Sequence, residues 1–322
     1  MTTTWPDASA PVGGRSREEA HHFRDFLEGP PSRLGDAPVL VVLGNCQAES
    51  LRLLLGADDV RTVMVPPLHD VRPQEVDPLR RWLARTDLLV AQPVRADFRG
   101  MPLGTQQLVE HLPSSARVAV VPIIRYAGLH PWHLVMHPPG LRDPEPPVVA
   151  YHDVRVVVRA AWQRAGRTAP PPVEPSPEAV LEVAAASVAE LARRERQAGA
   201  VVVSDLLQHP TAETVRTINH PGNELLEPVA ARLRQALGLA ERGPAVTRPL
   251  LRSVVAPLEE VVVRAHRLAT APVPDWRVGG RVVGAEEVAR AQLEWYAGRP
   301  DALDLALERS ADLRATLGLA SP

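Results

Sequence analysis

Residues 38–47, PVLVVLGNCQ, place a polar turn directly after a short apolar run. The run is rich in β-branched residues and ends at Gly44, which is typical of a strand buried on both faces of a parallel sheet. Beyond Asn45, apolar or small residues recur at helical spacing as far as Leu55. A buried strand followed at once by a helix predicts an α/β unit.

The same alternation of strand and helix continues along the chain. Three further strands and two further helices are predicted before residue 122, at a spacing of roughly 25 to 30 residues. This pattern predicts an α/β fold, a doubly wound and mostly parallel sheet with helices on both faces. Beyond the strand and helix at 38–55, the predicted helices and strands are 18–27, 60–65, 74–85, 87–91, 105–112, 117–121, 153–164, 176–197, 200–206 and 223–237.

Composition divides the chain into three predicted parts. Residues 1–36 form an N-terminal extension, partly disordered, with a short helix. Residues 37–242 form the α/β catalytic domain. Residues 243–322 form a mainly helical C-terminal subdomain, in which Gly279-Gly280 turns a small hairpin.

Charge and cysteine content exclude several classes of protein. The 322 residues carry a formal net charge of −2, which predicts no nucleic-acid partner, and all 36 basic side chains are arginine. The sequence therefore has no P-loop lysine and no Schiff-base lysine. Its single cysteine, Cys46, excludes an intramolecular disulfide and a multi-cysteine metal site.

Neither a membrane span nor a secretory signal is predicted. The apolar runs are much shorter than the ~20 residues that a membrane span needs. The first residues lack the apolar core of a secretory signal. We therefore expect a cytoplasmic protein with no membrane span.

Polar residues follow several predicted strands. Because ligands of open α/β sheets bind beyond the carboxyl ends of the strands, we expect these side chains to converge on one rim. They are Gly44, Asn45, Cys46 and Gln47 after the first strand, Gln92 and Arg95 after the third, Arg125 and His130 after the fourth, and Asp205, Asn219 and His220 after the last.

Cys46 is the candidate nucleophile. It is predicted at the first turn of a helix, where unpaired backbone N–H groups and the helix dipole lower the pKa of a thiol. The same N–H groups, with the Asn45 or Gln92 amide, are placed to stabilise a tetrahedral oxyanion. The alternative is that Cys46 is a small buried hydrophobic residue, as lone cysteines commonly are.

His220 is the candidate general base, because the flanking Asn219 and Pro221 restrict the backbone locally. Asp205 is expected to orient His220, which completes a Cys–His–Asp set of the kind that recurs on unrelated folds. The alternative is that Asp205 and His220 are ordinary turn residues.

Arginine and histidine suggest how a ligand is held. Arg95 and Arg125 are candidates for bidentate contacts to phosphate groups. No metal is expected, because prolines interrupt any helix face that His130, His133 and His137 would share. His130 is instead expected to line the substrate site. The sequence contains neither GxGxxG after the first strand nor GxSxG, which disfavours a dinucleotide oxidoreductase and an ordinary α/β-hydrolase.

With these residues assembled, the chain resembles the WcbI-type family of polysaccharide-biosynthesis acetyltransferases, over about residues 38–240. The matching segments, in order, are GNCQ at 44–47, QP at 92–93, the loop at 122–131, YHD at 151–153, SD at 204–205 and NHP at 219–221. The resemblance implies binding of coenzyme A and transfer of an acetyl group from acetyl-CoA to a sugar hydroxyl of a capsular glycan or its precursor. It also implies an architecture similar to that of SGNH-type hydrolases.

Carried onto this chain, the resemblance implies a catalytic set and a coenzyme A site. The catalytic residues are expected to be Cys46, His220 and Asp205. The residues expected to bind coenzyme A are Gly44, Asn45, Gln47, Gln92, Arg95, Arg125, His130 and Asn219.

Two chemical routes and two other classes of function stay open. In the first route the Cys46 thiolate attacks the thioester and His220 deprotonates the acceptor. In the second, transfer is direct and Cys46 only lines the channel for the pantetheine arm. An SGNH-like, thiol-dependent esterase or deacetylase would use the same residues with water as acceptor. A non-catalytic nucleotide- or sugar-binding protein would use none of them chemically.

Overall fold

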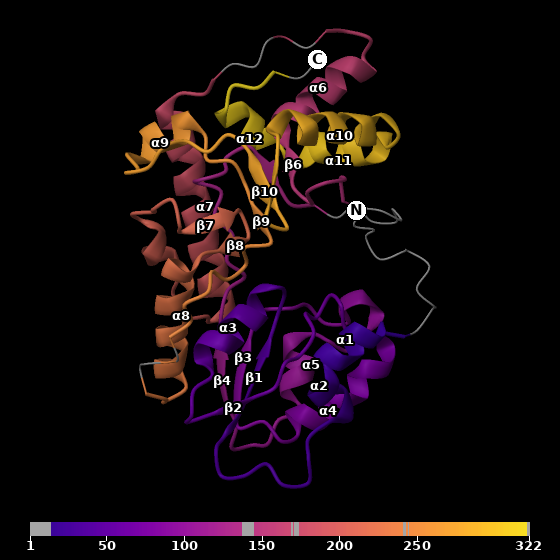
Figure 1. Ribbon diagram of the computed structural model, residues 1–322, viewed down its shortest axis with the longest axis vertical. Helices are drawn as coiled ribbons and strands as arrows, with labels where there is room; N and C mark the ends of the chain where they lie inside the picture. Colours follow the sequence, from indigo (N-terminus) through magenta and orange to yellow (C-terminus); the bar gives the residue numbers. More distant parts are fainter. Residues whose placement is uncertain are drawn as a thin grey trace. The chain divides into compact units, whose positions relative to one another are not determined.

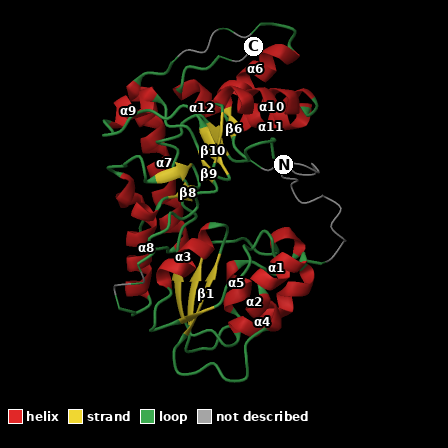
Figure 2. Ribbon diagram, viewed as in Figure 1, coloured by secondary structure: helices red, strands yellow, loops and turns green. Residues whose placement is uncertain are grey.

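The computed structural model describes residues 14–136, 145–168, 170, 174–240, 243 and 245–320 (Figures 1 and 2). These residues divide into two compact units. Unit 1 comprises the described parts of Met1–Ile123, Ala198–Val201 and Pro228–Thr247, and unit 2 comprises those of Ile124–Gln197, Val202–Glu227 and Arg248–Pro322. The division falls within helix α8 (Asn223–Ala236), at Pro228. The predicted three-part division of the chain stays a prediction.

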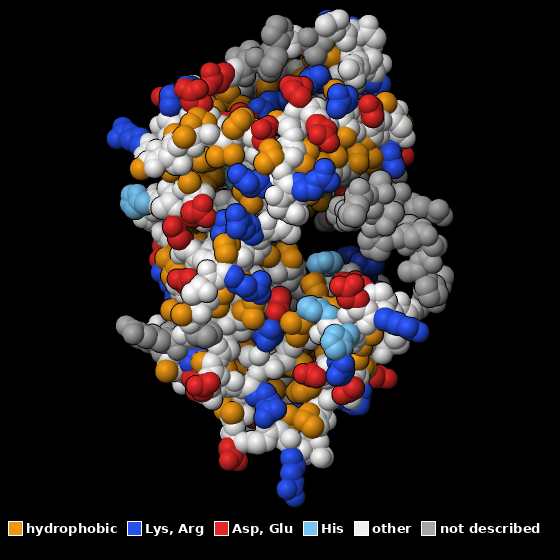
Figure 3. All heavy atoms as spheres, in the orientation of Figure 1, with side chains coloured by type: hydrophobic (Ala, Val, Ile, Leu, Met, Phe, Trp, Pro, Cys, Tyr) orange, Lys and Arg blue, Asp and Glu red, His pale blue; other side chains and the backbone are white. Residues whose placement is uncertain are grey.

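The surface carries both signs of charge. On the face shown in Figure 3, arginine and acidic side chains are interspersed, in keeping with the near-zero net charge. Among the residues that the structure describes, no helix has the length and apolar character needed to cross a membrane.

Unit 1 contains a four-stranded parallel sheet in the order β2-β1-β3-β4. The strands are β1 (Val39–Leu43), β2 (Arg61–Thr62), β3 (Leu88–Ala91) and β4 (Arg117–Val120). Every residue of β1 and β3 is buried, as expected for central strands that are covered on both faces. The predicted α/β fold with a parallel sheet is therefore confirmed.

Helices cover both faces of this sheet (Figure 1). Helix α3 (Gln47–Leu55) packs against β1 on one face. The other face carries α2 (Arg24–Glu28), α4 (Val76–Leu83) and α5 (Thr105–Val109). Unit 1 also contains the short helices α1 (Arg17–His22), η1 (Pro73–Glu75) and η2 (Phe98–Gly100), and the part of α8 from Pro228 onward.

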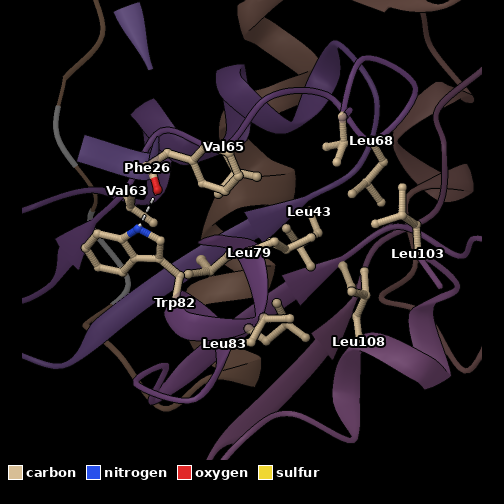
Figure 4. Packing of buried hydrophobic residues seen from close by; sticks show 14 of the residues in the cluster. Phe26, Leu43, Val63, Val65, Leu68, Leu79, Trp82, Leu83, Leu103 and Leu108 are labelled. Atoms are coloured by element: carbon tan, nitrogen blue, oxygen red, sulfur yellow. Dashed lines mark hydrogen bonds between the residues drawn. The ribbon is translucent and has the colours of Figure 1, made fainter. Parts of the chain in front are cut away.

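One core cluster of unit 1 lies between β1 and the helices of the second face (Figure 4). Alternate residues of β1, including Val41 and Leu43, point into it, since successive side chains of a strand face opposite ways. Trp82 closes one side and donates from Nε1 to the backbone carbonyl of Phe26 at 3.2 Å. The buried indole therefore keeps its one hydrogen bond.

Unit 2 combines helices with short antiparallel strands. Its helices are α6 (Val154–Arg164), α7 (Pro177–Ala198), η3 (Ser204–Leu207), α9 (Glu260–His266), α10 (Ala285–Ala297), α11 (Pro300–Arg309) and α12 (Ala311–Thr316). Its strand pairs are β5 (His133–Leu134) with β6 (His152–Asp153) and β7 (Val215–Thr217) with β8 (His220–Pro221). A three-stranded sheet joins β9 (Val254–Val255), β10 (Trp276–Val278) and β11 (Arg281–Val283).

The predicted hairpin at Gly279-Gly280 is confirmed between β10 and β11. The φ angles of the two glycines are 56° and 82°. A two-residue hairpin turn of this kind requires positive φ at both positions, which glycine adopts without strain.

The predicted strand at 200–206 is wrong, because the segment ends in the 3-10 helix η3. The N–H groups of Val203 and Ser204 both donate to the Glu195 carboxylate of α7, at 2.8 Å each. The Ser204 hydroxyl donates to the same carboxylate at 2.7 Å. The buried Glu195 carboxylate therefore accepts from the backbone N–H groups that, in a strand, would donate to a neighbouring strand.

Candidate functional site

The turn between β1 and α3 presents Cys46 at the start of the helix. Helix α3 begins at Gln47, and Cys46 is its N-cap residue. The Asn45 Oδ1 accepts from the Gln47 backbone N–H at 2.9 Å, which fixes the turn. The sequence predicted this arrangement of a strand, a polar turn and a helix.

Gln92 follows β3, and its side-chain amide bonds to the residues on either side of Cys46. Its Oε1 accepts from the Asn45 N–H at 2.8 Å, and its Nε2 donates to Gln47 Oε1 at 3.0 Å. A Cβ on Gly44 would lie 2.3 Å from the same Oε1, so the close approach requires glycine. The structure thus brings Gly44, Asn45, Cys46, Gln47 and Gln92 together.

Cys46 is half-buried, and its burial raises the pKa of the thiol. The backbone N–H groups of Cys46 and Gln47 act in the opposite direction, because they stabilise the thiolate, but burial is the larger effect. Burial therefore acts against the lowering of this pKa that is expected at the start of a helix. The Gln47 N–H also donates to Asn45 Oδ1, so the Cys46 N–H is the donor of this turn that is offered to a developing negative charge.

Five aromatic rings of unit 2 form a buried group that we call the ring cluster: His130, His133, Tyr151, His220 and Trp276. His133 stacks on Trp276 at 4.9 Å between ring centroids and on His130 at 5.8 Å. Tyr151 stacks on Trp276 at 5.9 Å and meets the His220 ring edge-on at 6.2 Å and 87°. Two predicted site residues, His130 and His220, therefore belong to one cluster.

His220 lies in β8 and is half-buried. Its Nδ1 is buried and has no hydrogen-bond partner among the residues that the structure describes. Burial lowers the pKa of His220, and a hydrogen bond to the Val254 backbone partly offsets the effect. The imidazole is therefore neutral at pH 7.

A hydrogen-bonded chain joins the ring cluster to Asn219. Thr217 Oγ1 donates to the Tyr151 hydroxyl at 2.8 Å, and that hydroxyl donates to Asn219 Oδ1 at 2.8 Å. Thr217 is fully buried and Tyr151 is 4% exposed, so the chain is shielded from solvent. Shielded bonds of this kind hold side chains in one orientation.

The other histidines of the ring cluster are also neutral. Burial lowers the pKa of His130 to about 4 and that of His133 to about 3. His130 Nδ1 lies 3.1 Å from the carbonyl oxygen of Pro257. In the described part of the chain, no three His, Cys, Asp or Glu side chains gather as metal ligands do, and His137 lies outside that part.

Three further predicted residues, Arg95, Arg125 and Asp205, are spread over both units. Arg95 in unit 1 and Asp205 in unit 2 are exposed. Arg125 in unit 2 is exposed as well, and its pKa is lowered by partial desolvation and by the charge of Arg194. The predicted catalytic residues are divided between the units, with Cys46 in unit 1 and His220 and Asp205 in unit 2.

Sequence reasoning missed several residues that support the site. Tyr151 lies in the YHD segment, which was noted as a motif but not as a site. Thr217 and Gln292 gave no signal, because a polar residue within an ordinary strand or helix does not reveal its distant partner, and Trp276 was noted only as one of four aromatic residues that could stack on a sugar.

The fold and the β1–α3 turn define an α/β protein with a half-buried cysteine at the carboxyl end of its first strand. The model of one family, described as polysaccharide biosynthesis enzyme WcbI, matches residues 39–242. The chain belongs to this family of enzymes, which confirms the resemblance noted in the sequence.

A solved structure supports the fold. It is of WcbI, described as a novel polysaccharide biosynthesis enzyme, in its native form without a disulfide bond between coenzyme A and a cysteine. The TM-score is 0.70 at 21% identity, over 88% of this chain and 99% of that chain. No protein of curated function matches this chain.

Proposed function

We propose that the protein is an acyl-CoA-dependent acetyltransferase that acts on a sugar hydroxyl of a polysaccharide or its precursor. Two findings support the donor and the pathway. The chain belongs to a family of polysaccharide biosynthesis enzymes, and the similar WcbI structure is described in terms of coenzyme A and a cysteine. The β1–α3 turn carries the proposal, because it offers a thiol at the start of a helix, beside the Cys46 backbone N–H.

In the first step, Cys46 attacks the acetyl-CoA thioester. The Sγ forms a bond to the carbonyl carbon, the bond from that carbon to the coenzyme A sulfur breaks, and the thiol proton passes to the leaving sulfur. The N–H group of Cys46 stabilises the oxyanion. One thioester replaces another, so the acetyl-enzyme is not a deep energy minimum.

In the second step, His220 acts as general base on the acceptor. A neutral imidazole has one N–H and one lone pair, and the unpartnered Nδ1 is the nitrogen that supplies the lone pair. It takes the proton of the sugar hydroxyl as the oxygen attacks the acetyl carbon and the Cys46 sulfur leaves. Asp205 is proposed to orient His220, and Arg95 and Arg125 to contact the phosphates of coenzyme A.

The first test needs no acceptor. The full chain is mixed with acetyl-CoA, quenched in acid and analysed by mass spectrometry of its peptides. We expect one acetyl group on the peptide that contains Cys46, and none in Cys46→Ala. Transfer retained in Cys46→Ala would overturn the covalent route. Acetate released from an aryl acetate without any need for coenzyme A would favour the esterase instead.

The second test is thermal unfolding with free coenzyme A. Ligand at 100 times its dissociation constant adds about 2.7 kcal/mol, which corresponds to a rise in Tm of roughly 4 °C for a chain of this length. Absence of a shift at millimolar coenzyme A would contradict the donor assignment.

A further inference from the structure

Gln292 of α10 is a polar side chain with no exposed surface. Its Nε2 donates to the Tyr151 carbonyl at 2.7 Å, and its Oε1 accepts from the Asp153 N–H at 3.2 Å. One amide therefore holds the backbone on both sides of His152. Gln292 lies in unit 2, beyond the residues 39–242 that match the family.

The segment that Gln292 holds carries the Tyr151 ring. That ring stacks on Trp276, which also lies beyond the family match, and stands edge-on to His220. The Tyr151 hydroxyl receives from Thr217 and donates to Asn219. Tyr151 thus contacts two neighbouring residues, Asn219 and His220, to which a functional role is assigned.

We propose that Gln292 is a positioning residue for the general base, acting through Tyr151 to set the orientation of Asn219 and His220. The inference rests on the proposed function, in which His220 takes the acceptor proton. Gln292 is buried and satisfies two backbone groups at once, and buried groups that lose such bonds carry the full cost of desolvation, so the segment is held in one position. The Tyr151 ring is fixed at both ends, by its backbone and by its hydroxyl.

Two variants, Gln292→Met and Tyr151→Phe, distinguish positioning of His220 from a contribution to the stability of the fold alone. Gln292→Met keeps an unbranched side chain of similar length but removes both hydrogen bonds. Tyr151→Phe keeps the ring and removes only the hydroxyl, so it tests the same connection if the first variant folds poorly. The matched control is Ser310→Ala, which removes a buried hydroxyl of unit 2 that bonds to Ala306.

The decisive readout is the titration of His220 by NMR of the labelled full chain, assigned by loss of its signal in His220→Gln. Burial keeps the wild-type midpoint below the ordinary value of about 6.5. We expect Gln292→Met and Tyr151→Phe to move it toward that value, and Ser310→Ala to lower Tm without moving it. An unchanged midpoint in both variants, with only a lower Tm, would overturn the proposal.

Acid-quenched acetylation supplies the second readout. We expect the two variants to form acetyl-Cys46 at the wild-type rate but to pass the acetyl group on ~10- to 100-fold more slowly, as is usual for a misplaced catalytic group. If the wild-type chain forms no acetyl-enzyme, the covalent step of the proposed function fails. The His220 titration still decides whether Gln292 positions the ring.

Discussion

Gly44 leaves no room for a side chain beneath the Gln92 amide. We expect Gly44→Ala to displace that amide, break its bond to Asn45 and lower the free energy of unfolding by about 1–3 kcal/mol, as overpacking does. Urea unfolding measures the loss. Gly298→Ala is the control, because a Cβ there meets only the Trp295 carbonyl, at 3.9 Å. Equal losses in the two variants would show that the close approach is unimportant.

The single thiol of Cys46 gives a direct measure of its pKa. Because burial raises that pKa, little thiolate is present at pH 7, and its fraction grows only as the pH rises past the ordinary range. We expect the rate of alkylation by iodoacetamide to rise with a midpoint above the value of about 8.5 for free cysteine. A midpoint near or below pH 7 would show that the N–H groups outweigh burial.

At the scale of elements, α7 determines how the chain continues at 203–204. We expect Glu195→Ala to lower the free energy of unfolding by about 3 kcal/mol, because the buried donors of Val203 and Ser204 lose their acceptor. Glu195→Gln keeps one acceptor oxygen and costs less. Thermal unfolding measures both changes.

Glu190 on the same helix supplies the control. Its carboxylate pairs with Arg193 at the surface, where a salt bridge contributes little. We expect Glu190→Ala to change Tm hardly at all. If Glu195→Ala were as mild, the carboxylate would not be what keeps 200–206 out of a strand.

The sequence predicted correctly those helices and strands whose formation depends on neighbouring residues alone. The apolar run at 39–43 and the helical spacing after Gln47 depend only on neighbouring residues, and both predictions are confirmed. The strand at 200–206 failed because its donors bind a side chain in the preceding helix. Strand propensity takes no account of a distant side chain that accepts the hydrogen bonds of the backbone.

The same distinction applies to the site. Asn45, Gln47 and Gln92 were found together because each follows a neighbouring strand of one sheet, and such strand ends share an edge. Gln292 and Thr217 are separated from Tyr151 by 141 and 66 positions in the sequence, and no local pattern predicts a contact between residues so far apart.

At the scale of the whole molecule, the family match stops short of the residues that complete unit 2. One of its core clusters takes five of nine buried residues from beyond position 290: Trp295, Tyr296, Ala302, Leu303 and Ala306. Helix α6 packs against α10 and α11 through this cluster. Residues 39–242 alone therefore lack the side chains that bury one face of α6.

We expect a chain that ends after Thr247 to keep unit 1 folded and to lose the structure of α6. Hydrogen exchange is the measurement. Amides of β1 and β3 should stay slow, since their partners remain in unit 1, while amides of α6 should exchange rapidly. Slow exchange in α6 of the shortened chain would show that unit 2 does not need its C-terminal helices.

The bonds of Gln292 fall on main-chain atoms of residues 151 and 153 rather than on their side chains. These two hydrogen bonds do not depend on which side chains the two residues carry. The side chains of the two residues have partners of their own, because the Tyr151 hydroxyl bonds to Asn219 and Asp153 pairs with Arg155. The path of the backbone at 151–153 and the orientation of its side chains are therefore set by separate contacts.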